Sequence, residues 1–310
     1  MDVNEALKQQ ILDLQDELSA KNADLERKDR ELQRYQHEVG QLNKKIEVLI
    51  AKISEELNMA TQLQRKLSPT ELPHIGGFEF SSKFRFGSRF GGDYFDIFEL
   101  PDKMKFVMIL SSASSHGVSA LLLTSLLKNS SLSVRDPQIS AYKLFEKICS
   151  DVRPEMGASD QVSLMVAIVD RRSFEMEVVA CGRLHAFLAR SSEAIESLYE
   201  GSAAFSKEDS RTFNETDKNS FHFRRVLLQS KEKLVFTSTG IVHAQHKSGE
   251  EFGLKNLKEA IKASVRSSVH ELRNEILYRL EKMIQQDPPL ADQTVLVAEV
   301  KDRVIKLAKS

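Results

Sequence analysis

Two short segments before residue 120 combine glycine with side chains that could do chemistry. Gly91-Gly92-Asp93-Tyr94-Phe95-Asp96 carries a carboxylate directly after a glycine pair, and Ser111-Ser112-Ala113-Ser114-Ser115-His116-Gly117 carries hydroxyls and one imidazole. Carboxylate oxygens are the ligands that Mg²⁺ and Mn²⁺ prefer, so Asp93 is a candidate metal ligand. An aspartate after two glycines is also a common turn residue. The segment by itself therefore leaves both roles open.

The remaining reactive side chains form no motif. His116 makes no nucleophile motif with Cys149, and the eight histidines show no zinc-ligand spacing. Gly91-Gly92 and Gly182 lack the lysine and the spacing of a nucleotide-binding loop. Cys149 and Cys181 lie in apolar surroundings, which is typical of buried, reduced thiols. A nucleophile triad, a zinc site and a nucleotide loop are therefore not indicated.

Composition narrows the class of protein further. The chain has 310 residues, and 44 Lys+Arg against 45 Asp+Glu leave no global charge to attract nucleic acid or an anionic membrane. The N-terminus has no basic region followed by an apolar core, and no window approaches the ~18 apolar residues of a membrane span. We expect a cytoplasmic protein that binds neither nucleic acid nor membrane.

The N-terminal 67 residues must form one long helix. They contain no proline and one glycine, and apolar residues recur every seven positions. The a positions are Ile11, Leu18, Leu25, Leu32, Val39, Ile46, Ile53, Ala60 and Leu67. The d positions are Leu7, Leu14, Lys21, Lys28, Tyr35, Leu42, Leu49, Glu56 and Leu63. The repeat predicts a coiled coil, which we interpret as a parallel homodimer, although packing on the chain's own domain is an alternative.

The rest of the chain mixes strands and helices, and it begins where Pro69 and Pro73 end the long helix. Alternation of apolar residues predicts strands over 78–86, 95–100, 104–110, 161–170, 175–181, 185–189, 233–237 and 293–300. Helices are predicted over 118–132, 141–152, 254–263 and 269–286, and a polar surface loop or hairpin excursion over 200–220. This order predicts an α+β sandwich with the long helix, 1–67, and the globular part, 68–310, as its two domains.

Taken together, these segments resemble the PPM-type serine/threonine phosphatases of bacterial signalling, the SpoIIE/RsbU-like family. That family has G-G-D-Y-Y-D followed one strand later by D-V-S-G-H-G, and here Gly91, Gly92, Asp93, His116 and Gly117 match it in order. Thr239-Gly240 stands where the family has D-G, and Asp292 stands in its terminal D-D-x-T. The resemblance covers nearly all of 57–300 and implies an α/β/β/α sandwich.

The resemblance also implies a two-metal site that has lost half of its ligands. In the family, four aspartates hold two Mg²⁺ or Mn²⁺ ions, which activate a water and polarise the phosphoryl group. Asp93 and Asp292 match two of these aspartates, but Ser112 and Thr239 occupy the other two positions. Ser112 stands where the metal-bridging carboxylate would be, and a neutral hydroxyl supplies no charge. The sequence predicts at most weak metal binding by Asp93 and Asp292.

The predicted function is therefore regulatory. We expect a SpoIIE-like pseudophosphatase with no catalytic residues and no required cofactor, which binds a signalling partner without efficient dephosphorylation. By resemblance, that partner is a phosphoprotein of a bacterial partner-switching pathway, such as an anti-anti-sigma-like domain. One alternative is an active or weakly active phosphatase that uses Mn²⁺ or Mg²⁺. Another is a coiled-coil scaffold whose globular end is an anchor.

Overall fold

The structure is a computed structural model, and it describes residues 3–67, 69, 71–87, 92–114, 118–214, 217, 219–285 and 288–301. The motif residues Gly91, His116 and Gly117 lie outside this range. The chain divides into two compact units, Met1–Met59 and Ala60–Ser310. Each unit is considered by itself below.

The long N-terminal helix is present as expected. Helix α1 spans Val3–Leu67, and Gly40 inside it lies in open space, with no atom within 4 Å of where a Cβ would stand. Its apolar heptad side chains from Ile11 to Ile53 are exposed on the helix surface. Among the described helices, including α1, none has a stretch both long and apolar enough to cross a lipid bilayer.

Two antiparallel sheets form the centre of the second unit. The first has the strand order β1-β11-β10-β6-β7. Its strands are β1 (Phe78–Arg85), β11 (Gln293–Val300), β10 (Lys233–Thr237), β6 (His185–Ala189) and β7 (Ile195–Tyr199). β10 and β11 lie inside the sheet and are buried along their whole length, because both faces are covered.

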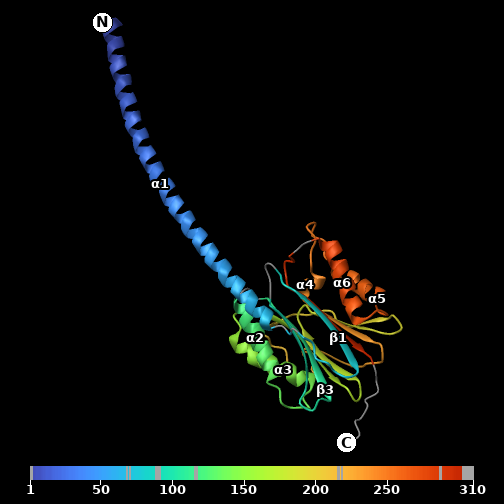
Figure 1. The fold of residues 1–310 in the computed structure, drawn as a ribbon. Helices are drawn as coiled ribbons and strands as arrows, with labels where there is room; N and C mark the ends of the chain where they lie inside the picture. Colours follow the sequence, from blue (N-terminus) through green and yellow to red (C-terminus); the bar gives the residue numbers. More distant parts are fainter. Residues whose placement is uncertain are drawn as a thin grey trace. The chain divides into compact units, whose positions relative to one another are not determined.

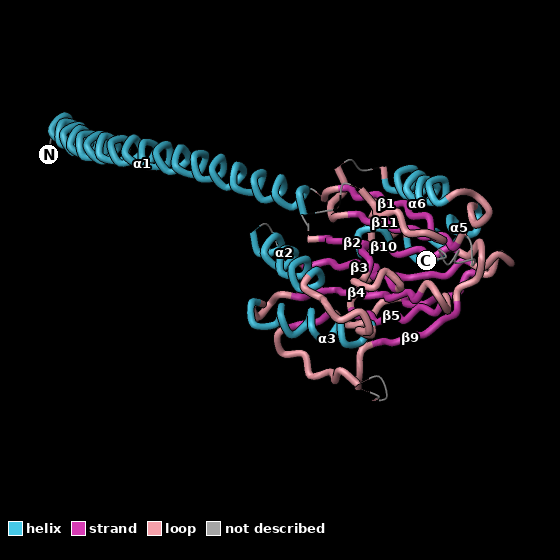
Figure 2. Tube along the Cα trace, turned by 60° about the horizontal axis from the view of Figure 1, so that its bottom comes forward, coloured by secondary structure: helices cyan, strands magenta, loops and turns pink. Residues whose placement is uncertain are grey.

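The second sheet has the strand order β2-β3-β4-β5-β9, and Figure 2 shows these strands side by side. They are β2 (Asp93–Glu99), β3 (Lys105–Ala113), β4 (Gln161–Asp170), β5 (Glu175–Cys181) and β9 (His222–Leu227), while the two-residue β8 (Phe205–Ser206) pairs with the start of β4. The strands are rich in β-branched and aromatic residues, which suit a pleated, buried surface.

Helices cover the outer face of each sheet. α2 (Val118–Leu132) and α3 (Ala141–Val152) pack on the second sheet through an apolar core that includes Tyr94, Ile109 and Phe145. α5 (Gly253–Ala263) and α6 (Val269–Ile284) pack on the first sheet, together with the four-residue helix α4 (Thr239–Val242). A third core, with Phe78, Phe106 and Phe236, fills the space between the sheets. The predicted α/β/β/α sandwich is therefore confirmed (Figure 1).

Local features explain where the helices begin. Ser140 accepts a hydrogen bond from the Lys143 amide at the start of α3. Ser268 and Glu271 form a capping box at the start of α6, which satisfies amides that have no partner inside the helix. The short 3-10 helix η1 (Arg153–Glu155) follows α3 and contains Pro154, which cannot continue a helix interior.

Candidate functional site

The four positions singled out by the sequence come together in one place. Asp93, Ser112, Thr239 and Asp292 all line a cavity of about 930 Å³ in the second unit. Asp93 and Ser112 come from β2 and β3 of the second sheet, Thr239 comes from α4 after β10 of the first sheet, and Asp292 comes from the loop before β11. Gly92 and Gly240 both contact Asp292. The predicted motif residues Gly91, His116 and Gly117 lie outside the described range.

Asp93 and Ser112 are neighbours because β2 and β3 pair in antiparallel register. Asp93 is the first residue of β2, and its cross-strand partner is Ser112 near the end of β3. Cross-strand partners point to the same face of a sheet, here the face toward the other sheet. Gly92 makes this approach possible, because it has a φ of +147° and a Cβ there would lie 2.8 Å from the Ala113 carbonyl oxygen. Asp93 therefore lies at the start of a strand and not in the turn that the two preceding glycines also allowed.

Asp292 holds the backbone that leads into β2. Its Oδ1 accepts a hydrogen bond from the Gly87 amide at 2.8 Å, and its Oδ2 accepts from the amides of Gly92 at 2.9 Å and Asp93 at 3.2 Å. The side chain is buried, with 4% of its surface exposed. A carboxylate bound by several N–H donors is strongly stabilised in its charged form, and here it ties two sheets together.

Ser238 and Thr294 complete the polar cluster, and sequence analysis assigned neither of them a role. The Thr294 hydroxyl donates to Asp93 Oδ2 at 2.8 Å, and the Thr294 amide donates to Ser238 Oγ at 2.9 Å. Thr294 is two residues after Asp292 and lies in β11, so strand alternation could have placed both on one face. Ser238 directly precedes the Thr239-Gly240 segment but carried no signal of its own.

The environment of Asp93 disfavours its charged form. Burial, and then repulsion by Asp292, raise the pKa of Asp93 to about 7, although hydrogen bonds from Ser238, Ser112 and Thr294 partly offset the rise. Only 2% of the Asp93 side chain is exposed. A buried acid beside a second carboxylate has its pKa raised in this way, because its charged form is both desolvated and repelled.

Thr239 lines the same cavity as Asp93, and its hydroxyl is hydrogen-bonded to the backbone. Its hydroxyl donates to the Arg183 carbonyl oxygen at 3.1 Å, and the residue begins the four-residue helix α4. The next residue, Gly240, packs directly on the backbone of Asp292. The Arg183 amide in turn donates to Ser163 Oγ at 3.1 Å. Thr239 therefore links α4 to the turn between β5 and β6.

The rest of the cavity lining is mixed. Ser114, Ser163, Ser202 and Ser206 line it with Arg183, and so do apolar residues such as Ile284 and Leu290. On the rim, His243 and Glu251 approach each other with Nδ1 and Oε2 3.3 Å apart. Among the described residues, no three His, Cys, Asp or Glu side chains gather closely enough to hold a metal ion. The arrangement offers many neutral hydrogen-bonding groups and two buried carboxylates.

Comparison with known proteins places this site in a family. The sequence profile described as Stage II sporulation protein E (SpoIIE) matches residues 102–301, which is more than half of the chain. The chain belongs to the SpoIIE family. No curated protein sequence matches it, so the family assignment stands on the profile, and solved structures bear on the fold.

Solved structures share the fold of this SpoIIE-family domain at low identity. The SiaA-PP2C domain of Pseudomonas aeruginosa matches with a TM-score of 0.64 and 16% identity over 81% of this chain and 98% of that chain. The RsbU and RsbW domains of Rv1364c from Mycobacterium tuberculosis match with a TM-score of 0.61 and 15% identity, over 76% of this chain and 63% of that one. The PP2C phosphatase domain of SpoIIE from Bacillus subtilis, with a fragment of its regulatory domain, gives 0.57 and 15%, over 72% and 64%. These likenesses establish a PPM phosphatase-like fold.

The close contact between Gly240 and Asp292 gives a prediction for this SpoIIE-family domain. A Cβ added at Gly240 would lie 2.0 Å from the Asp292 carbonyl oxygen, so Gly240→Ala must displace backbone and should cost about 3 kcal/mol of unfolding free energy. The control is Gly249→Ala, where no atom lies within 4 Å and only the φ of +87° is unfavourable, at about 1 kcal/mol. Urea unfolding of both variants measures the difference. Equal losses would mean that α4 does not pack on Asp292 as described.

His185 gives a prediction about pH, because it lies buried beside the site with neither ring nitrogen hydrogen-bonded. Burial, and secondarily His243, lower its pKa to about 4. The unfolded chain therefore takes up a proton near pH 6.5 that the folded chain takes up only near pH 4, so stability falls as pH decreases between these values. His185→Phe should remove about 3 kcal/mol of that loss. Urea unfolding from pH 7.5 to 4.5 tests this, and parallel curves for both proteins would contradict it.

Proposed function

We propose that this SpoIIE-family chain is a regulatory pseudophosphatase, which binds a signalling partner in its cleft and does not dephosphorylate it efficiently. The observation that carries the proposal is the donor set of the cavity. Asp93 and Asp292 are the two carboxylates at the motif positions, and hydroxyls stand at the other two. A third carboxylate of the lining, Glu251, stands outside the motif positions, is partly exposed and contacts His243.

This donor set does not fit a pair of divalent cations. Two Mg²⁺ or Mn²⁺ ions bring four positive charges, and Asp93 and Asp292 together supply at most two negative charges. A serine hydroxyl cannot bridge two ions as a carboxylate does, and Ser112 supplies no charge opposite Asp93. The Thr239 hydroxyl, which donates to the Arg183 carbonyl oxygen, is neutral and adds no negative charge. The residues therefore do not support metal-activated water in this cleft.

The carboxylates of Asp93 and Asp292 also accept hydrogen bonds from the protein itself. Asp292 accepts hydrogen bonds from the amides of Gly87, Gly92 and Asp93, and Asp93 accepts one from Thr294. A metal ion would have to compete with these donors for the same oxygens. Asp292 acts in this account as a structural anchor between the sheets. These hydrogen bonds account for an aspartate at position 292 without a bound metal.

The cleft remains suited to a polar ligand. A volume of about 930 Å³ lined by serine hydroxyls and Arg183 offers hydrogen-bond donors in place of metal ions. By resemblance to the family, the ligand we propose is a segment of a phosphoprotein of the anti-anti-sigma type, and the chain acts as a homodimer through α1. Binding without turnover would let such a protein sequester its partner or compete with an active phosphatase.

Phosphate release from a phosphoserine peptide tests the proposal. With millimolar Mn²⁺ or Mg²⁺, the purified chain and its Asp93→Ala variant should release phosphate at the same background rate. Metal-dependent release that Asp93→Ala abolishes would instead establish a phosphatase, for which the shared cavity of Asp93 and Asp292 is the supporting observation.

A deletion in the N-terminal helix distinguishes a scaffold from a pseudophosphatase and from an active phosphatase. Removing residues 1–56 should abolish the function of a scaffold, whereas substitutions in its cleft should be tolerated. The pseudophosphatase should instead lose binding of an anti-anti-sigma-like phosphoprotein when Arg183 is changed to Glu, measured by calorimetry. Binding that Arg183→Glu leaves unchanged would remove the cleft from the account.

A further inference from the structure

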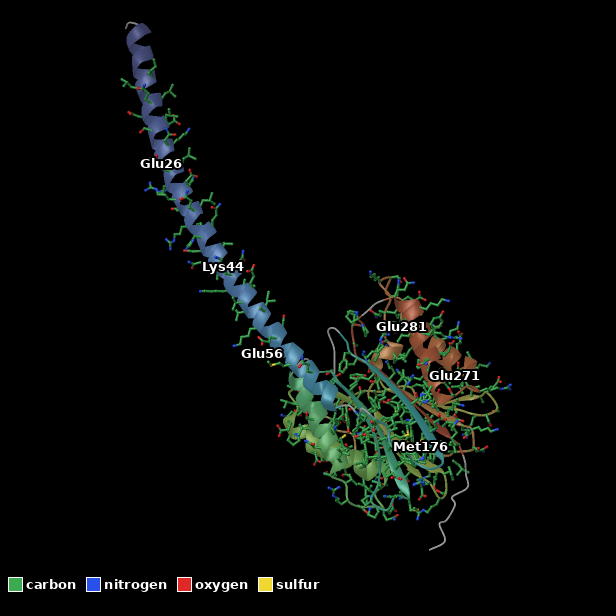
Figure 3. The ribbon with its side chains drawn as sticks, in the orientation of Figure 1. Glu26, Lys44, Glu56, Met176, Glu271 and Glu281 are labelled. Carbon is green, nitrogen blue, oxygen red and sulfur yellow. The ribbon has the colours of Figure 1, made fainter. Side chains whose placement is uncertain are left out.

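Helix α1 exposes an apolar stripe that its heptad side chains form. Eleven heptad side chains between Ile11 and Ile53 are each 51% to 62% exposed. Figure 3 shows side chains extending from α1 on all sides near the labelled Glu26, Lys44 and Glu56. An isolated helix with such a stripe is unstable in water, so another helix must pack against it. The charges beside the stripe indicate which helix this is and how it is oriented.

Parallel pairing with a second copy brings like charges together. In a parallel dimer each d residue faces the same residue of the other copy, so Lys21, Lys28 and Glu56 would each meet their own charge. The g position of one heptad faces the e position of the next, which places Asp24 opposite Asp29 of the second copy. The remaining g residues from Glu17 to Lys52 would face asparagine, glutamine, isoleucine or leucine. No attractive pair compensates for the repulsions.

The g positions carry opposite charges at the two ends of the helix. They are acidic at Glu17, Asp24, Glu31 and Glu38 and basic at Lys45 and Lys52. In an antiparallel coiled coil g faces g, so the acidic end of one helix lies beside the basic end of the other. Among the described residues, Lys45 and Lys52 make no ion pair within their own chain, so both are available to a second copy.

We propose that α1 pairs with a second copy of this chain in antiparallel orientation, with Leu25 of one copy opposite Leu49 of the other. This register places Asp24 beside Lys52 and Glu31 beside Lys45 of the second copy, twice each by symmetry. Its one like-charge contact is Glu38 with Glu38, and Glu38 already pairs with Arg34 at 3.0 Å. The inference rests on the dimerisation proposed above and replaces the parallel orientation expected from the heptads.

The same register resolves the charged d positions. Lys21 faces Ile53, Lys28 faces Ile46, and Glu56 faces Leu18 of the second copy, so no two charges meet in the seam. A lysine can lay its methylene groups on an isoleucine and keep its ammonium group in water. The apolar layers continue on both sides, with Leu32 facing Leu42. A consequence is that the Leu67 ends of the two helices lie at opposite ends of the coiled coil.

Disulfide trapping in the full chain tests orientation and register together. Leu25→Cys and Leu49→Cys are made in separate, differently tagged copies. Alone, neither variant should form a cross-linked dimer, because antiparallel pairing keeps identical residues far apart, beyond the ~7 Å Cα separation that a disulfide spans. Co-expressed, the two should cross-link, whereas Leu25→Cys with Leu42→Cys should not. The unmodified chain, whose Cys149 and Cys181 are buried, is the background control.

Each outcome decides the proposal. Cross-linking of Leu25→Cys or Leu49→Cys alone would establish parallel pairing and overturn the orientation while leaving dimerisation intact. Cross-linking to Leu42→Cys in preference to Leu49→Cys would overturn the register. A monomer in sedimentation equilibrium at micromolar concentration would overturn the dimer as well, without bearing on whether the cleft binds metal.

Charge reversal provides an independent readout. Lys45→Glu with Lys52→Glu turns four attractive contacts into repulsions and should raise the dimer dissociation constant about tenfold at low salt. Adding Asp24→Lys and Glu31→Lys to the same chain should restore the original affinity. In parallel pairing Lys45 and Lys52 face apolar residues, so neither the loss nor the rescue would be seen, and that result would contradict the proposal.

Discussion

Restoring the two missing carboxylates should convert this chain into one that binds divalent metal. The double variant Ser112→Asp with Thr239→Asp adds two negative charges to a cavity that already holds Asp93 and Asp292. Ser112 is the direct cross-strand partner of Asp93, so an aspartate there lies within reach of a metal held by Asp93. We expect millimolar Mn²⁺ to raise the melting temperature of the double variant by about 5 °C or more and to leave the natural chain unchanged.

The matched control is Ser112→Asn with Thr239→Asn, which has the same shape but no charge. Without metal, the double aspartate variant should be less stable than this control, because four carboxylates repel one another in a buried site. With Mn²⁺ the order should reverse. If Mn²⁺ stabilises the natural chain as much as the aspartate variant, Ser112 and Thr239 are not what limits metal binding.

The second large effect is expected at Asp292. Its replacement should lower the free energy of unfolding and not only remove a candidate metal ligand. Asp292→Ala leaves the buried amides of Gly92 and Asp93, and the partly buried amide of Gly87, without their acceptor. Each unsatisfied buried donor costs about 1–3 kcal/mol, so we expect a loss of about 4 kcal/mol in the free energy of unfolding. Urea unfolding at pH 8 in the presence of a chelator measures it without any contribution from metal.

Asp93→Asn is the contrasting variant at the neighbouring carboxylate. Because burial and Asp292 raise the pKa of Asp93 to about 7, the unfolded chain releases this proton near pH 4 and the folded chain only near pH 7, so the natural chain loses stability as pH rises between these values. The asparagine variant avoids this cost and should be the more stable protein above pH 7. Equal losses from Asp292→Ala and Asp93→Asn would show that the two carboxylates do not have the separate roles described here.

The main elements of the fold could be predicted from periodicity, and the exceptions have a physical cause. Strands β4, β5, β6, β10 and β11 were predicted with their observed bounds because they are long apolar runs. β7 and β9 were missed, since they are the last strands of their sheets and expose charged residues such as Glu196 and Arg225. α4 has four residues, too few to show a helical period.

The site was predictable only in part. Sequence order identified Asp93, Ser112, Thr239 and Asp292, and the structure brings them to one cavity. The register that pairs Asp93 with Ser112 depends on β3 continuing to Ala113, three residues beyond the predicted strand end. The role of Asp292 as an acceptor for Gly87 and Gly92 amides depends on contacts across about 200 residues of sequence, which no local pattern records.

The central claim is that this cleft does not hold the two metal ions of an active phosphatase, and calorimetric titration of the full chain with Mn²⁺ and Mg²⁺ tests it most directly. The account predicts no heat of binding up to millimolar metal, and binding of Mn²⁺ once Ser112 and Thr239 are both changed to Asp. Two Mn²⁺ ions bound per natural chain, with phosphoserine peptide hydrolysis lost on Asp93→Ala, would contradict it and make the protein an enzyme.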